Sequence, residues 1–197
     1  IISITNQETR EKLADLSLPC ATRYLLELQA GESPLNTINP STVTDAAVRE
    51  AEQPDWLVAH IRNAPTLLVV TVDLALVASM DKDLARVGVI SGGSIYPLAW
   101  NILLAARNEG LGGTLTTFVG GQEPALKALV DVPAEYAFAA MLPLGKPVKQ
   151  LTRLTRKPVE AFVVQDPLHR QAPILQAKVI EAYKQGGFPT LVLDGKK

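Results

Sequence analysis

Residues 92–117 read GGSIYPLAWNILLAARNEGLGGTLTT, and this stretch decides the fold class. Its first half repeats apolar residues every three to four positions, which predicts a helix that begins near residues 91–94 and ends at Gly110. The apolar stripe of this helix consists of Ile95, Leu98, Ala99, Ile102, Leu103 and Ala106. Residues 111–117 then predict a strand. A long amphipathic helix joined to strands favours helices layered over a sheet, in an α/β or α+β fold.

Further strands are predicted on both sides of this helix. Residues 66–72 read TLLVVTV, and residues 136–144 form a second continuous apolar run. Runs of this kind are typical of strands that are buried on both faces. Residues 1–4 predict a short strand, and residues 158–164 a strand or extended segment. The predicted order therefore alternates strands with helices along the chain.

Helices are also predicted over three other segments, residues 7–29, 44–63 and 122–130. A proline inside a helix removes a hydrogen bond, so we expect a break or kink at Pro19 and a break at Pro54. Residues 73–89 show no clear period, although residues 75–80 would suit a short helix. Residues 173–184 predict a last helix near the end of the chain.

The composition is that of a single globular domain. The chain has 197 residues, of which 47% are hydrophobic and 20% charged, enough to bury one core. A formal net charge of -1 argues against nucleic-acid and membrane-surface partners, because both need a strong basic field. One cysteine, Cys20, allows no internal disulfide, which favours a cytoplasmic location. The longest uncharged stretch, residues 87–106, contains Ser, Gly, Pro and Asn and is not expected to span a bilayer.

The residues that most often carry chemistry form no familiar motif. His60 and His169 are far apart and have no cysteine or histidine at ligand spacing, so no metal site is predicted. Cys20 has no base nearby in the sequence and is interpreted as a packing residue. The glycines of residues 110–113 follow a helix, whereas a dinucleotide fingerprint follows a strand. Residues 88–94, GVISGGS, lack the lysine of a phosphate loop.

A second stretch, residues 132–166, is informative when it is taken together with residues 92–117. It reads VPAEYAFAAMLPLGKPVKQLTRLTRKPVEAFVVQD. Along the chain the two stretches contain, in order, a long helix, a GLGG strand, a strand that starts at VPxxY and ends at PLGxP, and a basic-x-Pro segment. This order resembles the FMN-dependent nitroreductase family over residues 1–166. The resemblance implies a nitroreductase-like α+β domain over those residues, with a central mixed or antiparallel sheet flanked by helices and a long central helix.

The resemblance also implies a function. Members of the family form obligate homodimers with an FMN at each subunit interface. NAD(P)H gives a hydride to the flavin, which then reduces a nitroaromatic, quinone or similar acceptor in a ping-pong cycle. The flavin carries the chemistry, so no catalytic residue is predicted. The tail, residues 167–197, would pack on the partner subunit. Two alternatives stay open: a non-catalytic module of the same fold that binds or sequesters flavin or another ligand, and an unrelated α/β dimerisation domain.

Site residues follow from the resemblance in two groups. Arg156, two residues before Pro158, occupies the place of a family cation that binds the FMN phosphate, and Arg153 and Lys157 are weaker candidates. A guanidinium suits a phosphate, and residues 148–157 contain no acidic residue. The alternative is a solvated basic turn.

The second group is Leu115, Thr116 and Thr117, which match residues beside the flavin ring. There the backbone N–H near Thr117 would be offered to the ring's reactive nitrogen. The alternative is an ordinary strand end. Residues 91–94 fit a phosphate or substrate site at a helix start, or a simple N-cap.

The resemblance has one departure. The family binds FMN largely through an N-terminal segment with an Arg-rich stretch and a PSxxNxQPW-type loop, and Ile1 aligns just after that loop. Neither element occurs in these 197 residues, so the domain is expected to be N-terminally incomplete. Two or three charge-assisted hydrogen bonds, each worth about 1.5–3 kcal/mol, would be missing. We therefore expect this chain to hold FMN weakly.

Overall fold

The computed structural model describes residues 1–150, 152, 155–161 and 163. Residues 1–148 form one compact unit, and the described residues from Lys149 onward belong to a second. Arg153, the predicted helix over residues 173–184 and the 167–197 tail lie outside the described residues. Within the described ranges, none of the helices combines the length and the hydropathy needed to cross a bilayer.

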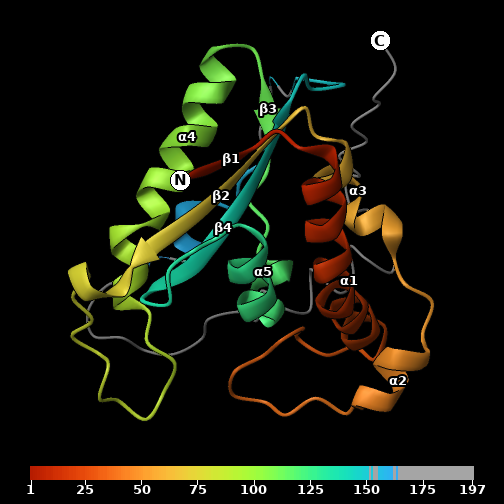
Figure 1. Ribbon diagram of the computed structural model, residues 1–197. Coiled ribbons are helices and arrows are strands. Elements are labelled where there is room, and N and C mark those ends of the chain that lie inside the picture. Colours follow the sequence, from red (N-terminus) through yellow and green to blue (C-terminus); the bar gives the residue numbers. More distant parts are fainter. Residues whose placement is uncertain (151, 153–154, 162, 164–197) are drawn as a thin grey trace. The chain divides into compact units, whose positions relative to one another are not determined.

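The first unit is built on an antiparallel sheet whose strands lie in the order β1-β2-β4-β3 (Figure 1). The strands are β1 (Ile2–Ile4), β2 (Thr66–Asp73), β3 (Gly112–Gly113) and β4 (Tyr136–Gly145). The two long apolar runs of the sequence thus become the central pair, β2 and β4, as expected for strands buried on both faces. Together with the helices, this sheet confirms the predicted α+β class.

One face of the sheet is covered by α1 (Gln7–Gln29), α3 (Asp55–Asn63) and α5 (Glu123–Leu129) (Figure 1). The helix α1 starts where the Asn6 side chain accepts a hydrogen bond from the N–H of Thr9 at 2.9 Å. The main core lies beneath these helices. It comprises Ile4, Leu13, Ala14, Leu18, Ala21, Val58, Ile61, Leu67, Val69, Val119, Leu126 and Met141.

We expected a break or a kink at Pro19, and the helix α1 runs through this residue without a break. Pro19 lies on the exposed side of the helix, and so does Asp15. The backbone carbonyl that loses its partner at the proline is that of Asp15. Because Asp15 is an exposed residue, the lost hydrogen bond costs less there than in a core. The other proline break is confirmed, since α2 (Asp45–Glu50) and α3 are separate and Pro54 precedes α3.

The other face of the sheet carries α4 (Tyr96–Asn108), which follows a 3-10 turn, η2 (Ile90–Ser94). This is the long helix predicted from residues 92–117. A smaller core lies under it, made of Val70, Ala99, Ala139, Ala140 and Leu142. The outward residues of α4 stay exposed, among them Trp100 at 61% and Leu104 at 51%. The apolar surface of α4 is therefore wider than the part of the helix that the sheet covers.

Three predicted elements differ in the structure. The strand over residues 111–117 is reduced to β3 and an isolated bridge between Thr116 and Met141, because β3 is an edge strand with one neighbour. In the described part of the segment 158–164, residues 159–161 form a 3-10 turn, η4 (Val159–Ala161), instead of extended chain, and the N–H of Ala161 bonds to the carbonyl of Pro158. The helix expected at 75–80 is a shorter 3-10 turn, η1 (Leu74–Leu76).

Candidate functional site

The candidate site begins where α4 turns back toward the sheet. Gly110 has φ +75°, a conformation that favours glycine, and the N–H of Leu111 bonds to the carbonyl of Ala106 at 2.9 Å. At Gly113 an added Cβ would lie 3.0 Å from Leu103 Cδ2 and overlap the side chain of Leu144. The glycines therefore let the chain pass tightly between α4 and β4.

The segment Leu115–Thr117 follows along the edge of the sheet. Thr116 is fixed by two backbone bonds to Met141, its N–H donating at 3.0 Å and its carbonyl accepting at 2.9 Å. In such a pair the N–H groups of the flanking residues point away from the neighbouring strand. Leu115 and Thr117 are exposed, and the N–H of Thr117 has no acceptor among the described residues. The segment thus presents a backbone donor and an apolar side chain at an open edge.

The side chain of Thr116 adds an unpaired polar atom to this edge. The residue is 7% exposed, and its Oγ1 has no hydrogen-bond partner within the described part of the chain. A buried hydroxyl without a partner costs about 1–3 kcal/mol. Such an atom is expected where a group from outside the chain completes the hydrogen bonding.

The predicted phosphate-binding residues belong to the second unit. Arg156 and Lys157 are both exposed, and Arg156 Nη1 donates to the carbonyl of Thr155 at 3.2 Å. Arg156 and Thr117 belong to different units, so it stays a prediction that they hold the phosphate and the ring of one FMN. The structure brings together Leu115, Thr116 and Thr117 on one edge.

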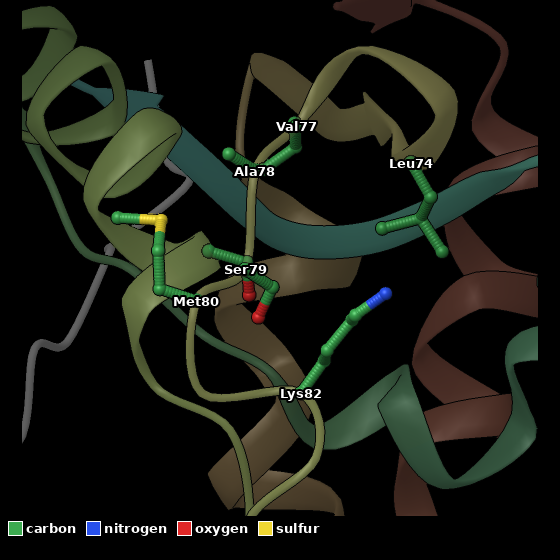
Figure 2. Close-up of a pocket in the computed structure, with 7 residues that line it drawn as sticks. Leu74, Val77, Ala78, Ser79, Met80 and Lys82 are labelled. Carbon is green, nitrogen blue, oxygen red and sulfur yellow. The ribbon is translucent and has the colours of Figure 1, made fainter.

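A pocket that the sequence patterns missed lies between the end of β2 and the start of α4. Its volume is about 630 Å³, and it is lined by Leu74, Val77, Ala78, Ser79, Met80, Lys82 and Ser91. Figure 2 shows the Lys82 side chain extending toward Leu74, with Met80 on the other side. All of the lining residues except Ser91 lie in residues 73–89, which show no clear period, so periodicity did not indicate a pocket there. The available signal was an apolar segment for which the sequence indicated only a short helix, over residues 75–80.

The loop beside this pocket is organised by one buried carboxylate. Asp81 is 4% exposed. It accepts hydrogen bonds from the N–H of Val89 at 2.8 Å, from Arg86 Nη1 at 2.7 Å and from Ser79 Oγ at 3.1 Å. The bond from Val89 and the Arg86 guanidinium hold the pKa of Asp81 well below its usual range. Asp81 therefore stays charged and holds both ends of the loop together.

Two partly buried residues, Cys20 and His60, have shifted pKa values. Burial raises the pKa of the Cys20 thiol, which disfavours the reactive thiolate. Burial lowers the pKa of His60, although a backbone hydrogen bond at Leu57 opposes the shift. The Nε2 atom of His60 has no partner among the described residues. Neither residue lines the pocket.

Solved structures with this fold have been determined for several flavin-related proteins. The NADPH:FMN oxidoreductase from Vibrio harveyi complexed with NAD+ matches with TM-score 0.58 and 16% identity, covering 94% of this chain and 65% of that one. Nitroreductase A from Vibrio parahaemolyticus matches with TM-score 0.56 and 19% identity, covering 94% and 62%. This chain thus spans less than two thirds of either protein.

A third match is oxidised iodotyrosine deiodinase bound to FMN and 3-iodo-L-tyrosine. Its TM-score is 0.52 and its identity 15%, and the match covers 85% of this chain and 75% of that one. At these identities the three structures establish a shared fold. No curated protein sequence matches this chain.

Membership of a family rests on a sequence match. The family model described as "Nitroreductase family" matches residues 1–146 of the 197 residues. The matched range contains the whole sheet, α4 and the edge segment Leu115–Thr117; it ends before Arg156. The chain therefore belongs to the nitroreductase family.

Proposed function

We propose that this protein is an FMN-dependent oxidoreductase that passes a hydride from NAD(P)H through the flavin to a nitroaromatic, quinone or similar acceptor. The observation that carries the proposal is the open edge at Leu115–Thr117, inside the range matched by the family. Support also comes from two proteins of the same fold, one an NADPH:FMN oxidoreductase and the other bound to FMN. The cytoplasmic location stays a prediction.

The edge segment fits the ring of FMN. The rim of the flavin ring carries nitrogen and carbonyl acceptors, and the N–H of Thr117 is a donor without an acceptor among the described residues. Thr116 positions this donor through its two bonds to Met141, and the unpaired Oγ1 marks incomplete hydrogen bonding. Leu115, 37% exposed, offers apolar surface to a planar ring. When bound, FMN supplies the redox chemistry.

The phosphate of FMN would be held by the basic segment of the second unit. Arg156 and Lys157 are exposed, and no carboxylate lies within residues 148–157 to neutralise them. A guanidinium can bind a phosphate with two parallel hydrogen bonds, whereas an ammonium acts as a point charge. We therefore assign the main role to Arg156 and supporting roles to Lys157 and Arg153.

The proposed assembly is a homodimer. Leu98, Trp100 and Leu104 are exposed on the outer side of α4. A group of large apolar side chains on one helix face is typical of a protein interface. A second copy that covers this face would complete the second layer over the sheet, and FMN would lie in the cleft that both subunits form.

An activity assay tests this function. The chain is mixed with FMN, and the oxidation of NADH and NADPH is followed separately with a nitroaromatic and a quinone as acceptor. Arg156→Gln is expected to weaken FMN binding about tenfold, because a charge-assisted hydrogen bond is worth about 1.5–3 kcal/mol. Arg49→Gln, at an exposed arginine of α2, is the matched control and should change nothing.

Two results would contradict the proposal in different ways. Saturable FMN binding without oxidation of either nicotinamide would support the non-catalytic binding module instead. Equal FMN affinity for Arg156→Gln and Arg49→Gln would remove Arg156 from the site and leave the activity to be explained by other cations.

A further inference from the structure

The pocket beside residues 74–91 lies in the most exposed apolar segment of the first unit. Large hydrophobic side chains in soluble proteins are usually covered, and a cluster that stays exposed marks a binding surface. Two of these side chains, Leu74 and Met80, line the pocket itself. The exposed large hydrophobic residues of this segment are Leu74, Leu76, Met80, Leu84, Val87, Val89 and Ile90.

The pocket wall is held in place before any ligand arrives. The carboxylate of Asp81 joins Ser79, which lines the pocket, to Val89 on the far side of the loop. A wall fixed in this way loses little conformational entropy when a ligand binds.

Electrostatics at the pocket favour an anion. Lys82 is the charged residue among those that line it, and its side chain has no ion pair among the described residues. The neighbouring carboxylate, Asp81, is turned inward and engaged by its own donors. Asp83 is exposed and does not line the pocket. The hydroxyls of Ser79 and Ser91 add polar groups to the lining.

We propose that this pocket binds a small apolar molecule that carries an anionic group, such as an aromatic carboxylate or sulfonate. The apolar body would contact Leu74, Val77 and Met80, and the anion would lie at Lys82, whose side chain extends toward Leu74 in Figure 2. A volume of about 630 Å³ suits a ligand of this size. The site is separate from the edge segment proposed for FMN and does not depend on that assignment.

Two fluorescent probes test the chemistry of the site. The anionic probe is 8-anilinonaphthalene-1-sulfonate, and the neutral one is N-phenyl-1-naphthylamine, which has nearly the same apolar body without the sulfonate. Lys82→Gln should weaken binding of the anionic probe about fivefold, the usual scale for an exposed ion pair, and leave the neutral probe unchanged. Lys82→Arg should bind both like the wild type, and Lys12→Gln, a lysine on α1, is the control for net charge.

The two methionines of the chain show where the probe binds. Met80 lines the pocket, whereas Met141 is fully buried in the main core. With ¹³C-labelled methionine methyl groups, the sulfonate should shift the Met80 signal and leave the Met141 signal in place. Met80→Leu assigns the two signals.

Three outcomes would overturn the proposal. The first is an unchanged affinity of Lys82→Gln for the sulfonate, which would remove the anion site. The second is a shift of the Met141 signal without one of Met80, which would place the probe elsewhere. The third is displacement of the probe by FMN with matching concentration dependence, which would make this pocket part of the flavin site rather than a separate one.

Discussion

The two faces of the sheet are covered to different extents. Under α1, α3 and α5 the described residues form a buried cluster of 12 hydrophobic side chains. Under α4 the corresponding cluster has 5, and the outer side of the helix exposes Trp100 and Leu104. The first face is covered by helices of the chain itself. The second offers a helix that is apolar on both sides, which is the arrangement expected when another protein surface completes the layer.

The residues on the two helices explain this difference. The helix α1 places Leu13 and Leu18 against the sheet, and its other side carries charged groups such as the Lys12–Glu8 pair. The helix α4 keeps its largest side chain, Trp100, on the outside. It packs on the smaller core through the buried Ala99 and through three partly buried residues, Ile102, Leu103 and the N-cap Ile95. Stability is therefore expected to depend on the first face, and association on the second.

The largest expected effect is a loss of core packing on the α1 face. Leu13→Ala should lower the free energy of unfolding by about 2–5 kcal/mol, because Leu13 is fully buried and truncation leaves a cavity. Leu104→Ala on the outside of α4 should change monomer unfolding by less than about 0.5 kcal/mol. Urea denaturation at low protein concentration measures both. Equal losses at the two positions would show that the faces do not differ.

A charged residue on the exposed side of α4 tests whether this surface forms the proposed dimer interface. Trp100→Glu should weaken self-association by at least about 30-fold, since a central tryptophan of an interface typically contributes 2 kcal/mol or more. Secondary structure should be unchanged, because the side chain is exposed. Sedimentation velocity over a range of concentrations gives the measurement, with Arg49→Glu on α2 as control. A wild type that stays monomeric at every concentration would refute the dimer.

A smaller loss of stability is expected from a substitution at Gly113 in the edge strand β3. Gly113→Ala should cost about 1–3 kcal/mol through overpacking, since the added carbon would overlap Leu144 and crowd Leu103 of α4. Gly121→Ala is the matched control, because no atom lies within 4 Å of its added carbon. Thermal unfolding of the two variants side by side measures the difference. A stability of Gly113→Ala equal to that of Gly121→Ala would show that the glycine is not required by packing.

The smallest effect is the pH dependence contributed by His60. Burial lowers the pKa of His60 in the folded protein, so the unfolded chain binds the proton more readily. The contribution of neutral His60 to the free energy of unfolding is therefore fully present above the unfolded pKa of about 6.5 and is lost as the pH falls below that value. The free energy of unfolding should fall from pH 7 to pH 5 more steeply in the wild type than in His60→Gln. Parallel pH profiles would count against a buried neutral histidine.

Sequence patterns predicted the elements in which local preference and tertiary packing agree. The apolar runs became β2 and β4, and the periodic stretch became α4, because each matches the period of its element. Of the break or kink predicted at Pro19, the break does not occur, because the sequence does not show that Asp15 and Pro19 lie on the exposed side of the helix. The strand predicted over residues 111–117 was mostly wrong, because pairing at an edge depends on a partner strand that local sequence does not specify.

Sequence patterns and the family resemblance predicted only part of the candidate site. Leu115, Thr116 and Thr117 could be placed by resemblance, but the unpaired Oγ1 of Thr116 is a property of packing. The loop at Asp81 was missed, since four donors from different positions converge on one carboxylate and no spacing rule describes them. The relation of Arg156 to the edge segment stays a prediction.

The central claim, that FMN binds at the edge segment, is tested most directly by titrating FMN into the chain labelled with ¹⁵N-threonine. The amide of Thr117, assigned through Thr117→Ser, should shift in a saturable way, whereas that of Thr71 within β2 should stay in place. Saturable binding of FMN that leaves the Thr117 amide unmoved would contradict the account.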